Sequence, residues 1–329
     1  MTRALISGIS GFVGSHLAEY LLAKTDWEII GMCRWRSPLD NIQSLIPEIN
    51  NGERVRLVYA DLRDGVAVRE AVEQADPTHV FHLAAQSYPK TSFSSPLDTL
   101  DTNVQGTVRL LDALRKSDAE IHVCSSSEVY GRAKTIPISE DAPFHPASPY
   151  AVSKVGADLM ARHYAEAYGM RVQVTRMFTH TGPRRGDVFA ESSFAKQIAM
   201  IEAGLIPPVV KVGNLKSLRT VADVRDAVRA YYMLLTIDPK PGEVYNIGGS
   251  HTCTVEDILN TLLSMSMSKI GIEVDPDRLR PIDADLQVPC CDKFKNHTGW
   301  RPMIPFEQTM ADLLTYWRDQ VKRGAPLQR

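Results

Sequence analysis

Three glycines near the N-terminus constrain the fold more than any other feature of this chain. They form the pattern Gly8-x-x-Gly11-x-x-Gly14, which follows a short apolar run at residues 4–7 and opens a helical pattern at residues 13–23. In such a sequence of strand, turn and helix, glycine allows unusual backbone dihedrals and lets the backbone approach a pyrophosphate at the helix N-terminus. The pattern predicts a dinucleotide-binding unit, although three glycines alone also occur in simple tight turns.

Apolar runs alternate with helical patterns through the first half of the chain. The apolar runs are residues 28–33, 56–60, 79–84, 121–124 and 171–176, and the helical patterns include residues 103–114 and 150–168. Continuous apolar runs are typical of parallel strands that are covered on both faces. The alternation therefore predicts an α/β fold, in which a Rossmann-type parallel sheet carries helices on both faces.

The second half of the chain has a looser pattern. Beyond residue 177, glycines and prolines separate helical patterns at residues 189–203, 221–235, 254–265 and 306–319. Such punctuation indicates a smaller unit built from excursions off the main sheet. We predict an NADP-binding Rossmann domain over residues 1–177, with a return segment at 215–240, and a smaller C-terminal α/β lobe for the substrate over 178–329.

Composition argues against several other classes of protein. The 37 basic and 39 acidic residues give a formal charge of −2, which provides no strong field for a nucleic acid or an anionic membrane. Five cysteines without CxxC spacing argue against a disulfide framework or a four-thiolate zinc site. Neither a signal pattern nor a long apolar segment is present. We predict a cytoplasmic protein with no nucleic-acid or membrane partner and no catalytic metal.

The residues after the second predicted strand indicate which dinucleotide is bound. NAD-binding proteins place an acidic residue there for the ribose hydroxyls, whereas a 2′-phosphate requires cations. The chain has Cys33-Arg34-Trp35-Arg36-Ser37 at this point, with no acid before Asp40. We predict NADP, held at its 2′-phosphate by Arg34, Arg36 and Ser37, with two solvated arginines as the alternative. The other expected cofactor contacts are Gly8, Gly11, Phe12, Val13, Gly14, Asp61, Leu62, Ala84 and Ala85.

Tyr150-x-x-x-Lys154 lies at the start of a predicted helix, which puts both side chains on one face. It follows residues 125–131, which cap the fifth predicted strand, where an open α/β sheet binds its ligands. An ammonium beside a phenol lowers the pKa of the phenol, so we expect Tyr150 to act as a base on a sugar hydroxyl near neutral pH. Hydride then leaves the same carbon for the nicotinamide, beside which both side chains are expected to lie.

The motifs, taken in order, resemble the extended short-chain dehydrogenase/reductase family over essentially the whole chain. The matching segments are Gly8-x-x-Gly11-x-x-Gly14, Asp61-Leu62, His82-Leu83-Ala84-Ala85, Asn103-x-x-Gly106-Thr107, the serine cap at 125–127, Tyr150-x-x-x-Lys154 and Gly182-Pro183. The resemblance implies a nucleoside-diphosphate sugar as substrate and Ser126 as the hydroxyl partner of Tyr150. It also implies a homodimer or homotetramer that associates through the helices at 95–116 and 150–168.

Further segments are similar to one branch of that family, the GDP-mannose 4,6-dehydratases and the related GDP-4-keto-6-deoxymannose reductases. These segments are residues 148–154, 180–186, 212–215, 280–281 and 298–302. The similarity implies a GDP-sugar, whose diphosphate suits arginine and whose ribose suits a carboxylate. The substrate-binding candidates are Gln86, Ser92, Ser127, Thr179, His180, Arg185, Arg219, Arg280 and Asp283. Each arginine has a surface salt bridge as its alternative.

Glu128 separates the reactions within this branch. A 4,6-dehydratase must remove the C5 proton and help water to leave C6, and one carboxylate can act first as base and then as acid. The resemblance implies that two hydroxyl residues followed by glutamate serve this purpose, and the chain has Ser126, Ser127 and Glu128. A glutamate that only caps a turn is the alternative interpretation.

Three functional hypotheses follow. The first is NADP-dependent 4,6-dehydration of GDP-mannose or a close GDP-sugar, with Ser126, Glu128, Tyr150 and Lys154 as catalytic residues. The second is NADPH-dependent reduction of a GDP-4-keto-6-deoxyhexose. Three departures from the usual pattern bear on this choice: Phe12-Val13 replaces Gln-Asp in the glycine turn, Thr179 replaces Asn, and Thr220 replaces Asp. The third, a non-catalytic NADP-binding protein, would be expected to lack Tyr150 or Lys154.

Overall fold

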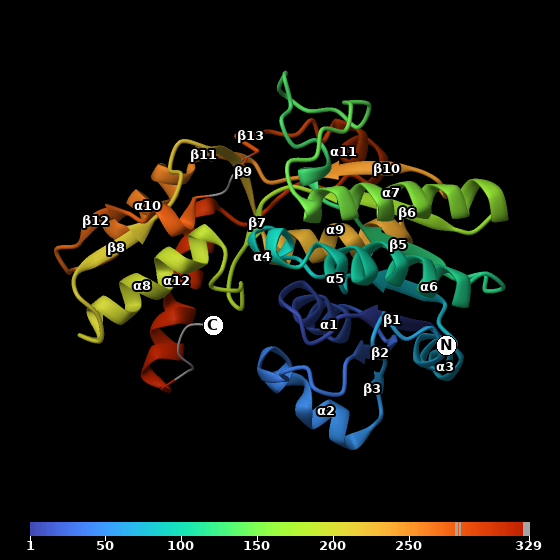
Figure 1. The fold of residues 1–329 in the computed structure, drawn as a ribbon. Helices are drawn as coiled ribbons and strands as arrows, with labels where there is room; N and C mark the ends of the chain where they lie inside the picture. The colour runs from blue at the N-terminus through green and yellow to red at the C-terminus, as the bar shows by residue number, and fades with distance from the viewer. Residues whose placement is uncertain (280–281, 283, 325–329) are drawn as a thin grey trace.

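The computed structural model describes residues 1–279, 282 and 284–324. Its main sheet has seven parallel strands in the order β10-β6-β5-β4-β1-β2-β3, which confirms the predicted Rossmann-type α/β fold. The strands are β1 (Arg3–Ser7), β2 (Glu28–Cys33), β3 (Val55–Tyr59), β4 (His79–His82), β5 (Glu120–Cys124), β6 (Val172–Met177) and β10 (Val244–Ile247). Figure 1 shows this sheet on one side of the molecule and a smaller lobe on the other.

Helices cover both faces of the main sheet. On one face α1 (Phe12–Lys24) lies over β1 and β2 and packs against α9 (Val224–Thr236), which lies over β5 and β6; on the other face lie α3 (Gly65–Ala75), α6 (Gly106–Ala113) and α7 (Pro149–Tyr168). Burial on both faces explains why the strands are continuous apolar runs. The shorter helices around the sheet are η1 (Asp40–Leu45), α2 (Ile46–Asn51), α4 (Pro89–Ser94), α5 (Pro96–Leu100), η2 (Asp101–Gln105), η3 (Ser127–Val129) and α11 (Asp292–Thr298).

The lobe has its own apolar core. It lies among three helices, α8 (Ala190–Glu202), α10 (Val255–Ser264) and α12 (Phe306–Lys322), which appear on the left of Figure 1. Two small sheets complete the lobe. The first pairs β8 (Val209–Val212) with β12 (Gly271–Val274), and the second contains β7 (His180–Thr181), β9 (Leu218–Asp223), β11 (His251–Thr254) and β13 (Leu286–Gln287). A short helix, η4 (Pro276–Arg278), follows β12.

The predicted helix at 221–235 starts three residues too early. Residues 218–223 form β9, and the helix begins at Val224 because the Asp223 carboxylate caps it, accepting the Arg225 N–H at 2.8 Å. The chain then leaves the lobe sheet through α9 and rejoins the main sheet as β10. The division into a domain over 1–177 and a lobe over 178–329 stays a prediction.

The described residues can be compared with the expectations for membrane spans, metal sites and disulfides. Within residues 1–279, 282 and 284–324, no helix has the length and apolar character needed to cross a membrane. In the same part of the chain, no three histidine, cysteine, aspartate or glutamate side chains gather as a metal site. All five cysteines are free thiols.

The order of the strands places the expected ligand site. From β1 the chain first adds β2 and β3 on one side and then crosses to add β4, β5 and β6 on the other, so the strand order switches between β1 and β4. Open α/β sheets bind ligands at such a switch point, in the crevice outside the carboxyl ends of the strands. The glycine turn follows β1, residues 83–86 follow β4, and the serine cap follows β5. The fold therefore brings the sequence motifs to one edge of the sheet.

Candidate active site

The glycine turn between β1 and α1 has no room for side chains. Gly8 has a φ of +78°, and a Cβ at this position would lie 3.0 Å from the Cα of Ala84. A Cβ on Gly14 would lie 2.2 Å from the Gly8 carbonyl oxygen. The bare backbone at the N-terminus of α1, which begins at Phe12, fits the pyrophosphate of a dinucleotide.

The end of β2 presents cations to solvent. Arg34 and Arg36 are exposed, and the Ser37 N–H donates to the Arg34 carbonyl at 2.9 Å, so the three residues share one turn. Exposed guanidinium groups fit a phosphate.

At the end of β3, the two predicted cofactor contacts differ in their surroundings. Asp61 is held by Arg63 at 2.8 Å, whose hydrogen bonds lower the pKa of Asp61. Leu62 is buried in the core.

Ser126 and Tyr150 meet where β5 ends and α7 begins. The start of α7 is fixed by Ser148, whose hydroxyl accepts the Ala151 N–H at 3.0 Å, and by Pro149 in the first turn. Ser126 is hydrogen-bonded to Tyr150, and its hydroxyl also accepts the Glu128 N–H at 3.2 Å. Two local caps therefore bring the hydroxyl and the phenol together.

The charge state of Tyr150 differs from the sequence expectation. Burial raises the pKa of Tyr150 above its usual range, the hydrogen bond with Ser126 opposes this shift, and the nearby Glu128 adds to it. The Lys154 Nζ donates to the Cys124 carbonyl at 2.7 Å. The predicted lowering of the pKa of Tyr150 is wrong, because burial is the largest influence on this pKa and raises it.

Glu128 lies on η3, directly after the serine that caps this short helix. Its side chain is half-buried and close enough to Tyr150 for its charge to raise the pKa of the phenol. Ser127, the other hydroxyl residue of the motif, is buried beside it. A carboxylate, a phenol and a hydroxyl are thus available to one ligand at the end of β5.

The segment after β4 is held by Asn103, which had no assigned role in the sequence analysis. The Asn103 Oδ1 accepts the Gln86 N–H at 2.8 Å, and its Nδ2 donates to the Gln86 carbonyl at 2.9 Å and to Ser153 Oγ at 2.8 Å. Gln86 is half-buried, as are Ala84 and Ala85. Asn103 stood within a recognised motif, and a polar residue buried on a predicted helix is the signal that could have identified it.

Ser92 lies deeper than the other substrate candidates. It is fully buried in α4, and its hydroxyl donates to the Pro89 carbonyl at 2.6 Å. Across from α4, Thr179 is half-buried and its carbonyl accepts the Ala222 N–H at 2.9 Å. The hydroxyl of Thr220, the other departure from the family pattern, bonds within the lobe sheet to a threonine of β11 at 2.8 Å.

Arg185 brings the lobe side of the site to the glycine turn. Its guanidinium lies 3.3 Å from the ring centroid of Phe189 and 5.2 Å from that of Phe12, and its Nε is 3.3 Å from the Glu191 carboxylate. The His180 ring stacks on Phe12 with centroids 5.8 Å apart. Two aromatic faces and one carboxylate therefore orient a cation that is only 13% exposed.

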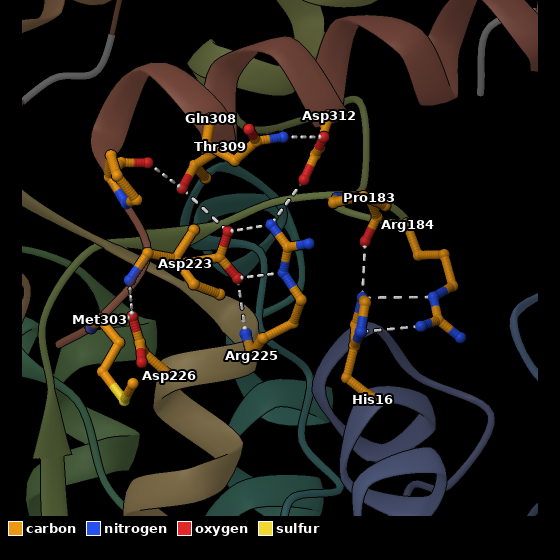
Figure 2. Close-up of polar contacts among 12 residues, drawn as sticks. His16, Pro183, Arg184, Asp223, Arg225, Asp226, Met303, Gln308, Thr309 and Asp312 are labelled. Carbon is orange, nitrogen blue, oxygen red and sulfur yellow. Dashed lines mark hydrogen bonds and ion pairs between the residues drawn. The ribbon is translucent and has the colours of Figure 1, made fainter.

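Figure 2 shows how α1 holds the loop that carries Arg185. The preceding residue, Arg184, has a φ of +72° and pairs with Glu19 at 2.6 Å. Arg184 also donates to His16 Nδ1 at 2.7 Å, while His16 Nε2 lies 2.9 Å from the Pro183 carbonyl. Burial and then the charge of Arg184 lower the pKa of His16 to about 4, so the neutral ring accepts at one nitrogen and donates at the other.

A second junction in Figure 2 ties α9 to α12. The buried Asp223 carboxylate binds the Arg225 side chain at 2.7 Å and accepts the Thr309 hydroxyl at 2.8 Å. Arg225 in turn pairs with Asp312 at 2.7 Å. Because Asp223 is the last residue of β9, this junction fixes the strand that carries Arg219.

Arg219 lies beside a buried amide that the sequence analysis missed. Arg219 donates to the Leu218 and Ala284 carbonyls and pairs in register with Gln287 of β13. Gln287 is 1% exposed, and neither atom of its amide has a hydrogen-bond partner among the described residues. A two-residue strand has no periodic signal in the sequence, so Gln287 could not be found there. Arg280 and Asp283 lie outside the described residues.

The fold and the site together define an extended short-chain dehydrogenase/reductase. A parallel sheet of this order carries a glycine turn after β1, a serine cap after β5 and the pair Tyr150 and Lys154 on α7. The sequence model of a family described as GDP-mannose 4,6 dehydratase matches residues 5–313. The chain belongs to the GDP-mannose 4,6-dehydratase family, as its motifs predicted.

Individual relatives represent both activities that the sequence analysis considered. The chain is 33% identical to a GDP-mannose 4,6-dehydratase of Yersinia enterocolitica, over 99% of this chain and 96% of that protein. It is 31% identical to a GDP-6-deoxy-D-mannose reductase of Pseudomonas aeruginosa, over 97% of this chain and 98% of that protein. Among solved structures it is similar to RMD from Pseudomonas aeruginosa complexed with NADPH, with a TM-score of 0.81, 30% identity, and coverage of 97% and 100%.

Proposed function

We propose that the protein is an NADP-dependent GDP-mannose 4,6-dehydratase, which forms a 4-keto-6-deoxy sugar nucleotide. The observation that carries this proposal is the position of Glu128 beside Ser126 and Tyr150. Reduction of a ketone requires only the phenol as proton donor, whereas dehydration also requires a base at C5 and an acid at C6. A carboxylate next to the phenol provides both.

The glycine turn and the exposed arginines support NADP as the cofactor. We propose that the backbone around Gly8, Gly11 and Gly14 holds its pyrophosphate and that Arg34 and Arg36 hold its 2′-phosphate. When bound, NADP⁺ supplies the hydride acceptor for C4 and the hydride donor for C6. The remaining proposed contacts are Phe12, Val13, Ser37, Asp61, Leu62, Ala84, Ala85, Tyr150 and Lys154.

Tyr150 and Ser126 act in the oxidation of C4. Ser126 hydrogen-bonds the substrate O4, and Tyr150 takes the O4 proton as the hydride leaves C4. Because burial raises the pKa of Tyr150, the phenol must first lose its own proton, and the charge of Arg185 is one influence that lowers this pKa. Lys154 is held by the Cys124 carbonyl at the same strand end.

Glu128 acts in the elimination that follows. The 4-keto group acidifies the C5 proton, the Glu128 carboxylate removes it, and the C6–O bond breaks as the same carboxyl protonates the departing hydroxyl with help from Ser127. One proton and one hydroxyl leave the sugar as water. The carboxylate is regenerated, and as C6 is reduced C5 takes up one proton, which balances the O4 proton that Tyr150 received, so both residues are unchanged over a turnover.

The lobe holds the substrate for these steps. Arg185 lies near the glycine turn and Arg219 lies on β9, and paired hydrogen bonds from guanidinium groups suit a diphosphate. We propose that both contact the GDP moiety. The roles of Gln86, Ser92, Thr179 and His180 at the hexose, and of Arg280 and Asp283 at the nucleotide, stay predictions.

Product analysis without added reductant tests the proposed function. Wild-type protein incubated with GDP-mannose and NADP⁺ is expected to yield a product that has lost one water, read by mass spectrometry. Glu128→Gln is expected to slow this conversion about 10²- to 10⁴-fold. The matched control is Glu166→Gln, which changes an exposed glutamate of α7 and should leave the rate unaltered. Unchanged GDP-mannose in the wild-type reaction would refute the proposal.

Reduction of a GDP-4-keto-6-deoxyhexose is the second candidate function. The raised pKa of Tyr150 favours it, because a reductase needs this phenol as an acid. Phe12 in the glycine turn, where the dehydratase pattern has glutamine, points in the same direction. Oxidation of NADPH by the wild type with the keto sugar as substrate, measured beside the dehydration assay, decides between the two.

A homo-oligomer is proposed from the outer helices of the main sheet. Leu97 of α5 is 79% exposed, and Val152 and Leu159 of the adjacent α7 are also exposed. Exposed apolar side chains on neighbouring helices fit an interface between copies. Light scattering of the wild type distinguishes a homodimer or homotetramer from a monomer. A charged substitution at Leu97 should shift the measured mass toward that of the monomer. The cytoplasmic location and the absence of nucleic-acid and membrane partners stay predictions.

A further inference from the structure

Behind the catalytic residues lies a buried ion pair that the reaction itself does not use. Arg176 of β6 binds Asp158 of α7 through two hydrogen bonds, Nε to Oδ2 at 2.8 Å and Nη2 to Oδ1 at 3.0 Å. The two side chains are 2% and 0% exposed. Burying charges is costly even when they are paired, so a pair in this position calls for a functional reason.

Tyr130 connects this pair to the turn that carries Glu128. Arg176 Nη1 donates to the Tyr130 hydroxyl at 2.9 Å, and the guanidinium lies 5.2 Å from the centroid of the ring. The Tyr130 hydroxyl in turn donates to Asn246 Oδ1 of β10 at 2.7 Å. Tyr130 directly follows η3, two residues after Glu128, so a shift of the phenol would move the turn.

The segment after this turn is held by the same group of residues. Arg176 Nη1 also donates to the Glu140 carbonyl at 2.7 Å. Asn246 donates from its backbone to the Glu140 carboxylate at 2.8 Å and from its side chain to the Ile138 carbonyl at 2.9 Å. The start and the middle of the loop between η3 and α7 are therefore bonded to strands of the main sheet.

The other end of the network reaches the helix of the catalytic tyrosine. Asp158 is one helical turn after Lys154 and two turns after Tyr150 on α7. Arg176 is thus bonded directly to the helix that carries the phenol and, through Tyr130, to the turn that carries Glu128. We propose that Arg176, acting through Asp158 and Tyr130, is a positioning residue that fixes the Glu128 carboxylate relative to Tyr150.

The physical basis is the rigidity of a fully bonded buried network. Such a network has one favoured arrangement, because any other leaves a buried polar group without a partner. Proton transfer from C5 depends on the placement of the carboxylate, and a misplacement of about 1 Å can cost about 10²-fold in rate. The inference rests on the proposed dehydration, because only that reaction uses Glu128.

Tyr130→Phe tests the role with a minimal change. It removes one hydroxyl and keeps the ring that packs against Phe178 and Phe144. We expect kcat for GDP-mannose to fall about 10- to 100-fold while KM and the Kd of NADP⁺ stay nearly constant. We also expect absorbance of NADPH to build up during turnover, because the step of Glu128 slows after that of Tyr150 has occurred. A purely structural role would lower Tm without this build-up.

Two further variants keep the test decisive. Tyr164→Phe changes a buried tyrosine of α7 outside this network; it is the matched control and should retain wild-type kcat. Arg176→Lys keeps a positive charge for Asp158 but loses the forked geometry, and it should reproduce the kcat defect of Tyr130→Phe. If the wild type dehydrates GDP-mannose and Tyr130→Phe matches its control, this inference alone is wrong. If the wild type forms no dehydrated product, the proposed function and this inference fall together.

Discussion

The two sides of the candidate active site are built in different ways. On the sheet side, Ser126 and Tyr150 are placed by caps within a few residues of themselves, at the end of one strand and the start of one helix. On the lobe side, Arg185 is placed by Phe12 and Glu191, which come from different elements. Short-range placement gives the tight geometry that proton transfer needs, whereas placement by contacts between distant elements suits the capture of a ligand.

In the proposed function, this difference gives the two sides separable roles. Groups on the sheet side act on the reacting carbons, so their loss should appear in kcat. Groups on the lobe side bind parts of the substrate that do not react, so their loss should appear mainly in KM. Substitutions on each side test whether effects on kcat and on KM separate in this way.

The largest effect is expected at the phenol. Tyr150→Phe removes the group that takes the O4 proton, so kcat should fall about 10³-fold with little change in KM. Circular dichroism and NADP⁺ binding should show that the fold and the cofactor site persist. A rise in KM with little change in kcat would mean that the phenol contributes to substrate binding, and the proposed difference between the two sides would be wrong.

The pH dependence of the reaction should reflect the same phenol. Burial raises the pKa of Tyr150, so the base required for oxidation is scarce near neutral pH. The dehydration rate should therefore rise about tenfold per pH unit on the alkaline side of neutrality, until another group limits it. A reductase, which uses the protonated phenol, would keep a constant rate over the same range. Initial rates in overlapping buffers distinguish the two profiles.

A smaller effect is expected on the lobe side. Arg185→Met keeps much of the packing volume but removes the charge offered to the diphosphate, so KM should rise about 10- to 100-fold while kcat changes little. Lys322→Met, at an exposed lysine near the end of α12, is the control and should leave both constants unaltered. Equal losses in kcat and KM would mean that the lobe also takes part in chemistry.

The smallest effect concerns the ion pair that joins the two sides. Burial alone would raise the pKa of Glu19, but hydrogen bonds from Arg184 and Ser44 lower it. Its contribution to stability is therefore present above about pH 4.5 and is lost as the pH falls through the lowered pKa. Because Glu19 is 34% exposed, Arg184→Met should cost at most about 1 kcal/mol at neutral pH. Urea midpoints measured against pH test this sign.

A matched ion pair within the lobe provides the control for this last prediction. Arg318 pairs with Glu202 at 2.7 Å, away from the sheet side. Arg318→Met should lose comparable stability and keep the wild-type KM. Arg184→Met should also raise KM, because it frees the loop that carries Arg185. Identical KM values in the two variants would contradict a role for Arg184 in substrate binding.

The sheet could be predicted because its signals are local. A strand buried on both faces is an apolar run, and a turn that touches backbone must be glycine, as Gly14 shows. Even so, the strand expected at 79–84 ends at His82. The next two N–H groups, those of Leu83 and Ala84, donate to the Ser7 hydroxyl at 3.0 and 3.1 Å rather than to a neighbouring strand.

The lobe was harder to predict because its strands are short and pair at long range. The two residues of β13 are strand only because they lie beside β9, more than 60 residues earlier. Pairing with β11 and β13 likewise makes residues 218–223 a strand, β9, although the sequence predicted a helix from residue 221. No periodicity in such short segments distinguishes strand from loop.

The sequence by itself determined the parallel sheet and predicted the cofactor edge and the candidate catalytic side chains, because apolar periodicity, glycine turns and helix caps act between near neighbours. Only the tertiary structure decided that burial raises the pKa of Tyr150, that Lys154 donates to a strand carbonyl, and that Arg176 joins α7 to the residue that follows η3. These properties depend on burial and on partners that are distant in the chain. A side chain's charge and orientation are set by its surroundings in space, which a linear pattern does not contain.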